Sequence, residues 1–132
     1  LNETLRLYPP AGMISRTSQT PDRLCDREIG AGDTVILPIY ALHRNVRLWD
    51  DPDAFRPDRW NDAVPDRYAF LPFGDGPRIC IGASFAIQEA AIILATLLAQ
   101  FRFRAVPGRL PDPVMVIALR PEGGVWLEAD PL

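Results

Sequence analysis

The longest apolar stretch of the chain runs from Ser84 to Phe101, where the polar residues after Ser84 are only Gln88, Glu89, Thr96 and Gln100. A helix that is apolar nearly all round is buried in a larger protein or in a membrane. Its longest run without a polar residue, Ala90 to Ala95, is far shorter than the ~20 residues that span a bilayer. The pattern therefore predicts a long helix that is buried in protein.

The first half of the chain predicts one short helix and a small antiparallel sheet. Residues 1–8 have the pattern of a helix interior without a preceding cap, which predicts a truncated helix that ends at Pro9-Pro10. Residues 13–18 are expected to be extended. The β-branched segments 27–29 and 34–39, joined by Gly30-Ala31-Gly32-Asp33, predict a hairpin.

The remaining segments predict short elements separated by prolines. Residues 40–44 predict a short helix, and Asp51-Pro52 has the N-cap and first-turn proline of another. The proline- and aromatic-rich segment 55–72 predicts an ordered meander, and residues 101–105 and 114–127, the latter with Gly123-Gly124, predict strands and a turn. The fold class is therefore α+β, and residues 1–132 are expected to form a single partial domain.

The strongest candidate for chemistry is Cys80, which lies in the segment Phe73-Gly74-Asp75-Gly76-Pro77-Arg78-Ile79-Cys80-Ile81-Gly82 just before the long helix. Cysteine binds metal ions as the thiolate, and the partial positive charge at a helix N-terminus stabilises an anion. Glycines without a Cβ let the backbone turn with φ > 0 and let a flat ligand lie close. Arg78 is placed to reach a carboxylate on such a ligand.

Other sites built on a strand-to-helix turn lack required residues in this sequence. A phosphate-binding loop needs a lysine and the chain has none; a dinucleotide fingerprint from Gly74 would need a glycine where Ile79 stands. A hydrolase elbow at Ser84 lacks a following histidine, since His43 is the only one, and no C-x-x-C supports a zinc site. A buried structural cysteine is the remaining alternative for Cys80. Cys25 lies in a polar loop or strand edge without partners, and we interpret it as structural.

The ten residues 73–82 match every fixed position of the F-x-x-G-x-R-x-C-x-G signature and so resemble the cytochrome P450 family of haem-thiolate monooxygenases. The resemblance covers nearly the whole chain and implies the C-terminal part of that mainly α fold. It implies haem as cofactor, with Cys80 as the axial ligand of the iron. The residues expected to contact the cofactor are Phe73, Gly76, Arg78, Cys80, Gly82 and Arg16.

A second constellation joins the first helix to the meander. Glu3 and Arg6 share one helix face at i and i+3, a common pattern whose ordinary interpretation is an exposed surface pair. With Phe55-Arg56-Pro57-Asp58-Arg59-Trp60, they resemble the E-x-x-R helix and P-E-R-F meander of the family. The resemblance implies a structural triad of Glu3, Arg6 and Arg59. Asp58 and Trp60 stand where Glu and Phe are commoner, so that only the aromatic packing at Trp60 is expected to differ.

Four further features have both a functional and an ordinary interpretation. Arg16 stands where family members often place a basic side chain on a haem propionate, and is otherwise an exposed strand residue. The segments 11–14 and 116–118 lie where the family lines its substrate pocket, and are otherwise plain core. His43 is expected to hold a turn by hydrogen bonding and not to bind iron.

Charge and composition restrict the partners. A net charge of −3 without a basic patch predicts no nucleic-acid or membrane-surface partner, and no membrane segment is visible. Two unpaired cysteines fit a reducing, cytoplasmic compartment. All 14 basic residues are arginine, which hints at a GC-rich bacterial source.

The resemblance implies an oxidoreductase that inserts one atom of O₂ into a small organic substrate. The electrons come from a redox partner, a ferredoxin or a flavoprotein reductase. The family's distal helix, which supplies groups for proton delivery, lies upstream of the matched residues, so we expect the chain to be inactive by itself. The alternative is a non-catalytic fragment or relic that keeps the scaffold.

Overall fold

The computed structural model describes residues 1–61 and 66–132 of the chain. Its α-helices are α1 (Asn2–Leu7), α2 (Ile39–Leu42) and α3 (Ala83–Leu98), and its 3₁₀ helices are η1 (Pro57–Trp60), η2 (Arg67–Ala69) and η3 (Gly76–Arg78). The strands are β1 (Ile14–Thr17), β2 (Asp22–Leu24), β3 (Arg27–Ile29), β4 (Thr34–Leu37), β5 (Phe101–Ala105), β6 (Pro113–Met115), β7 (Leu119–Pro121) and β8 (Leu127–Pro131).

The predicted hairpin between residues 27–29 and 34–39 is wrong in its pairing. β3 pairs with β2, β4 pairs with β1, and the predicted second strand ends at Leu37 because Ile39 already begins α2. β2 and β3 are joined by Cys25 and Asp26, whose φ angles of 47° and 63° give a turn that matches the twist of a hairpin. At the Gly30–Asp33 turn, the Gly32 N–H donates to the Ser18 carbonyl and the Ser18 N–H donates to the Asp33 carbonyl. The β2–β3 hairpin therefore lies at the tip of the β1–β4 pair.

The predicted helix at Asp51-Pro52 is also absent. Asp51 has φ of 45° and is followed by a single turn, closed by the Ala54 N–H, which donates to the Asp51 carbonyl. The arginines of α1 and η1 donate hydrogen bonds to the carbonyls of residues 50–52 and 54. A helix needs those carbonyls for its own N–H groups, and the tertiary contacts therefore override the local capping signal.

The other predicted elements are present with shifted ends. α2 begins one residue before the predicted 40–44 helix, and α3 ends at Leu98 because Phe101 already belongs to β5. Within the predicted meander 55–72, the structure places η1 and η2, while residues 62–65 lie outside the described part. The C-terminal strands form two antiparallel pairs, β5 with β8 and the hairpin β6–β7.

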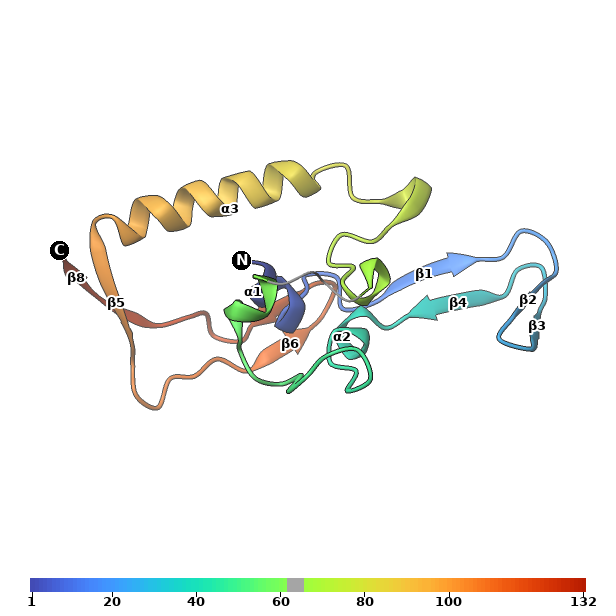
Figure 1. Cartoon of the computed structure of the whole chain (residues 1–132), viewed down its shortest axis with the longest axis horizontal. Coiled ribbons are helices and arrows are strands. Elements are labelled where there is room, and N and C mark those ends of the chain that lie inside the picture. Colours follow the sequence, from blue (N-terminus) through green and yellow to red (C-terminus); the bar gives the residue numbers. More distant parts are fainter. Residues whose placement is uncertain (62–65) are drawn as a thin grey trace.

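Figure 1 shows α3 along one edge of an elongated molecule, with α1, α2 and β6 near the middle and the β1–β4 ribbon at the far end. The loop that carries Cys80 leads into the N-terminus of α3. The buried apolar side chains include those of Leu7, Ile39, Trp49 and Ala69, which lie around α1, α2 and the meander. The core of the chain therefore lies where α1, α2 and the meander meet.

The long helix is predicted to be buried in protein, but the rest of this chain does not bury it. None of the residues of α3 is buried, and its large apolar side chains are exposed, among them Phe85, Ile92, Ile93, Leu94, Leu97 and Leu98. The exposed surface is 9979 Å² for 14.7 kDa, whereas a compact monomer of that mass exposes about 7,000 Å². Among the described residues, no helix is long and apolar enough to cross a membrane.

Candidate functional site: the cysteine loop and the buried arginine network

Cys80 lies on an exposed loop between η3 and α3 and carries a free thiol. Its N–H donates to the Phe73 carbonyl at 3.0 Å, which closes the loop from residue 73 to residue 80. Its own carbonyl accepts the Ala83 N–H at 3.3 Å, just after Gly82, the N-cap of α3. The backbone on both sides of the sulfur is therefore fixed, while the thiol itself faces outward.

The glycines of this loop differ in what they contribute. Gly74 and Gly76 have φ of 74° and 73°, the left-handed region that favours glycine, and a Cβ at Gly76 would meet no atom within 4 Å. Gly82 has φ of −86°, so the interpretation that it provides a left-handed turn is wrong. A Cβ at Gly82 would instead lie 3.9 Å from the Cys80 sulfur. The absence of a side chain there keeps the approach to the thiol open.

A groove of about 410 Å³ lies at the start of α3 and is lined by Phe73, Ala83, Ser84, Ile87, Gln88 and Ala91. Its wall is mostly apolar, and Phe73 is the residue whose carbonyl fixes Cys80. Among residues 1–61 and 66–132, no three His, Cys, Asp or Glu side chains form a cluster that could hold a metal ion. One soft sulfur ligand beside an apolar groove fits a flat prosthetic group such as haem.

The two arginines expected to bind the cofactor are both exposed. Arg78 ends η3, two residues before Cys80, and no ion pair joins it to another residue of the described segments. Arg16 lies on β1, where its guanidinium donates to the Ser15 carbonyl at 2.8 Å. The structure thus places Arg78 in the cysteine loop and Arg16 on a separate strand, and their contact with a cofactor stays a prediction.

An ion pair that the sequence did not indicate ties the meander to the cysteine loop. Arg67 of η2 donates to Asp75, the residue before η3, at 2.7 Å. The Gly76 N–H and the Arg67 guanidinium lower the pKa of the Asp75 carboxyl. Because Arg67 is largely exposed, we assign this pair a local role in orienting the start of η3.

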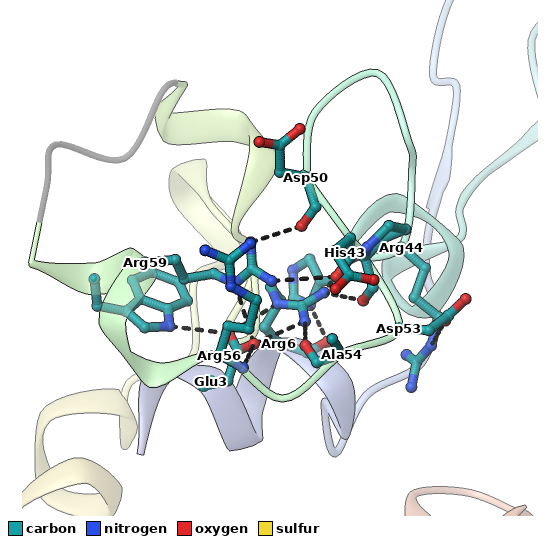
Figure 2. Close-up of polar contacts among 12 residues, drawn as sticks. Glu3, Arg6, His43, Arg44, Asp50, Asp53, Ala54, Arg56 and Arg59 are labelled. Atoms are coloured by element: carbon teal, nitrogen blue, oxygen red, sulfur yellow. Dashed lines mark hydrogen bonds and ion pairs between the residues drawn. The ribbon is translucent and has the colours of Figure 1, made fainter.

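The Glu3 carboxylate is buried and accepts five hydrogen bonds (Figure 2). The donors are Arg6 Nη2 at 2.9 Å, Arg6 Nε at 2.9 Å, the Arg56 N–H at 2.8 Å, Arg59 Nε at 3.1 Å and Trp60 Nε1 at 3.0 Å. Burial by itself raises the pKa of Glu3, but the hydrogen bonds from Arg6, Arg56 and Trp60 outweigh it and lower the pKa to about 2. The carboxylate is therefore ionised throughout the neutral range.

The Arg6 guanidinium is fully buried and uses all five of its N–H groups. Besides the two bonds to Glu3, its Nη1 donates to the carbonyls of His43 at 2.8 Å and Pro52 at 2.6 Å, and its Nη2 to that of Ala54 at 3.0 Å. The guanidinium carbon also lies 5.2 Å from the ring centre of Trp49. A buried charge with every donor satisfied avoids the large desolvation penalty of an unpaired one.

Arg59 adds the third member of the network. Its Nη1 and Nη2 donate to the carbonyls of Asp50 and Asp51 at 2.9 and 3.2 Å, while its Nε donates to Glu3. The structure thus brings together Glu3, Arg6 and Arg59, the three residues of the proposed triad. Figure 2 shows the side chains of Glu3 and Arg6 from α1 and of Arg59 from η1 meeting beside the backbone of the 50–54 turn, so the network joins α1 to a turn and a helix that lie more than 40 residues further along the chain.

Trp60 is the member of the network that sequence reasoning missed. It was expected only to alter aromatic packing, yet its indole N–H donates to Glu3 and its ring packs 4.6 Å from that of Phe70 and 5.7 Å from that of Trp49. The available signal was chemical: unlike phenylalanine, tryptophan carries a donor that seeks an acceptor when it is half-buried.

Replacing Trp60 by phenylalanine is expected to lower the free energy of unfolding by about 1–2 kcal/mol, because one donor to a buried carboxylate is lost. Urea unfolding measures the change. Trp126→Phe is the matched control, since the Trp126 indole donates to the Gly123 carbonyl at an exposed position. An equal loss in both variants would contradict a special role for the bond to Glu3.

His43 is buried at the end of α2 and binds the backbone on two sides, as the sequence analysis expected for a turn-holding residue. Its Nδ1 lies 3.1 Å from the Arg6 carbonyl, and its Nε2 accepts the Leu71 N–H at 2.9 Å. Burial lowers the pKa of His43 to about 4, and the nearby charges of Arg6 and Arg44 act in the same direction. The imidazole is therefore neutral at ordinary pH.

Comparison with known proteins decides the family. A family model for cytochrome P450 matches residues 1–127. The chain belongs to the cytochrome P450 family. It is 40% identical over 136 residues to rat cytochrome P450 4B1 and 38% identical over 134 residues to a cytokinin hydroxylase of Arabidopsis thaliana, covering 100% of this chain and 27% and 26% of those relatives.

Similarity to a solved cytochrome P450 structure confirms the fold class. Cyanobacterial CYP120A1 with bound retinoic acid matches with a TM-score of 0.91 at 29% identity, over 99% of this chain and 31% of that one. The chain thus spans about a quarter of the length of the curated relatives it matches. Its mixed helix and strand content fits the C-terminal part of the P450 fold. The comparisons do not support the predicted bacterial source, because the relatives include rat and Arabidopsis proteins.

Proposed function

We propose that this chain is the haem-binding C-terminal part of a P450 monooxygenase, in which Cys80 is the axial ligand of the iron. The observation that carries the proposal is the placement of one exposed, free thiol on a backbone-fixed loop beside an apolar groove. When bound, haem supplies the activation of O₂ for insertion of one oxygen atom into an organic substrate.

The other residues of the loop have supporting roles in this proposal. Phe73 forms one wall of the groove and fixes the Cys80 backbone through its carbonyl. Gly76 and Gly82 leave room for a flat ring, and Arg78 and Arg16 neutralise carboxylates at its edge. The network of Glu3, Arg6 and Arg59 acts at a distance by holding the meander against α1.

The large exposed apolar surface supports the proposal that residues 1–132 are one part of a larger domain. An isolated chain would leave the apolar side chains of α3 in water, which is unfavourable by about 25 cal/mol per Å². We therefore expect no turnover from this chain by itself. In the full domain, electrons would come from a ferredoxin or a flavoprotein reductase, and the substrate would be a small organic molecule.

The test uses the longest polypeptide that contains this chain, loaded with haem. The reduced carbonyl complex is expected to show the red-shifted Soret band of thiolate ligation, and Cys80→Ala is expected to abolish it. Cys25→Ala is the matched control, because Cys25 is the other free and exposed cysteine, at the β2–β3 turn, and should leave the band intact. A band typical of histidine ligation, or no haem uptake, would favour the alternative of a non-catalytic relic.

A further inference from the structure

The imidazole of His43 connects two parts of the molecule that the proposed function uses separately. One nitrogen faces the backbone of Arg6 in the buried network, and the other faces the backbone of Leu71, two residues before Phe73. The ring is fully buried, and its centre lies 5.3 Å from that of Phe70. A buried side chain with both polar atoms engaged has one defined orientation.

The hydrogen-bond partners settle the tautomer of this ring. The Leu71 N–H can only donate, so Nε2 must be the unprotonated acceptor. The proton of the neutral ring is then on Nδ1, where it donates to the Arg6 carbonyl. The positive charges of Arg6 and Arg44 both act against protonation of the imidazole and so lower the pKa of His43. His43 therefore acts as a donor toward α1 and an acceptor toward the meander.

From Leu71 the backbone bonds continue to the cysteine. The Leu71 carbonyl accepts the Gly74 N–H at 3.1 Å and so closes a turn over residues 71–74. The carbonyl of Phe73, inside that turn, accepts the Cys80 N–H at 3.0 Å. The bond from His43 to Leu71 thus holds the start of the turn to which the cysteine backbone is attached.

We propose that His43 is a positioning residue for Cys80: its Nε2 anchors the 71–74 turn on the buried arginine network and thereby fixes the backbone of the thiolate ligand. The inference rests on the proposed function, because a ligand position has meaning only if Cys80 binds a metal. A histidine that served only the packing of α1 on α2 would need the bond to Arg6 but not the bond to Leu71.

Two substitutions separate these roles. His43→Gln places an amide oxygen near the position of Nε2 and can still accept the Leu71 N–H, whereas His43→Asn keeps a donor near Nδ1 but is too short to reach Leu71. Ile39→Val is the control for lost stability alone, since Ile39 is fully buried on the same helix and has no polar side-chain atom.

Amide hydrogen exchange in the longest polypeptide gives the first readout, and it does not depend on haem. His43→Asn is expected to speed exchange at Leu71, Gly74 and Cys80 by about tenfold relative to amides of the β5–β8 pair, as expected for a lost buried bond. His43→Gln and Ile39→Val should leave this ratio near that of the parent protein. Uniform acceleration in all three variants, or none at Cys80 in His43→Asn, would overturn the inference.

The loaded protein gives the second readout. His43→Asn is expected to lose the red-shifted carbonyl band about tenfold faster than the parent protein, with His43→Gln restoring the parent rate. Equal rates for His43→Asn and the parent protein would contradict the positioning role. If the parent protein shows no such band, the proposed function fails, while the exchange ratios still decide whether His43 anchors the cysteine loop.

Discussion

Replacing Arg6 by leucine is expected to lower the free energy of unfolding by about 3–5 kcal/mol, measured by urea unfolding of the longest polypeptide that contains the chain. The Glu3 carboxylate would lose two of its five hydrogen bonds and its main counter-charge while remaining buried. The carbonyls of His43, Pro52 and Ala54 would lose their donor at the same time. The large effect follows from these orphaned partners rather than from the ion pair alone.

The control for Arg6→Leu is Arg104→Leu. Arg104 forms ion pairs with Glu128 and Asp130 on the β5–β8 pair, but all three side chains are exposed. Exposed pairs contribute about 0–1 kcal/mol, so this variant should unfold close to the parent protein. A loss of less than about 1 kcal/mol for Arg6→Leu would show that the partners of the buried guanidinium find other donors, and the network would then not be essential to the fold.

Acidification from pH 6.5 to pH 4 is expected to lower the free energy of unfolding by about 3 kcal/mol through His43 alone. The pKa of His43 falls from 6.5 to about 4 because the folded protein buries the ring. Between these values the unfolded chain binds a proton at this site and the folded chain does not, so stability falls as the pH falls. Below pH 4 the imidazole of His43 is protonated in both the folded and the unfolded chain, so His43 causes no further loss of stability as the pH falls.

The measurement compares urea unfolding of the parent protein and His43→Gln at several pH values. The difference between their unfolding free energies should shrink from pH 6.5 to pH 4, because glutamine does not titrate. Below pH 4.5 the parent protein should lose further stability through Glu3, whose folded pKa of about 2 lies below its ordinary 4.5. A constant difference across pH 4–6.5 would show that folding does not lower the pKa of His43.

The parts of the candidate site that depend on residue types at fixed spacing could be predicted from the sequence. The segment 73–82 shows its cysteine, glycines and arginine directly, and Glu3 and Arg6 share a helix face by their spacing. The acceptors of Arg6 were not predictable, because they are backbone carbonyls that any residue carries. The residue types at Pro52 and Ala54 therefore give no indication that their carbonyls accept hydrogen bonds from Arg6 of α1.

The two wrong predictions about the fold also arose because tertiary partners cannot be identified from local sequence. The capping signal at Asp51-Pro52 is local, and no helix forms there because Arg6 and Arg59 bind carbonyls of that turn. The segments 27–29 and 34–39 were correctly predicted to contain strands, but pairing depends on which turn matches the strand twist, and the Cys25-Asp26 turn does so. Local patterns identify elements, while competition among partners decides how they pair.

The sequence by itself determined the family, the cysteine loop and the existence of most helices and strands, because these depend on side-chain types and periodicities within short segments. Only the tertiary structure showed that Glu3 has five donors, that Trp60 is one of them, and that His43 joins Arg6 to Leu71. These contacts join residues up to 57 positions apart, as between Glu3 and Trp60, and hydrogen bonds between such distant groups are set by packing and not by local order.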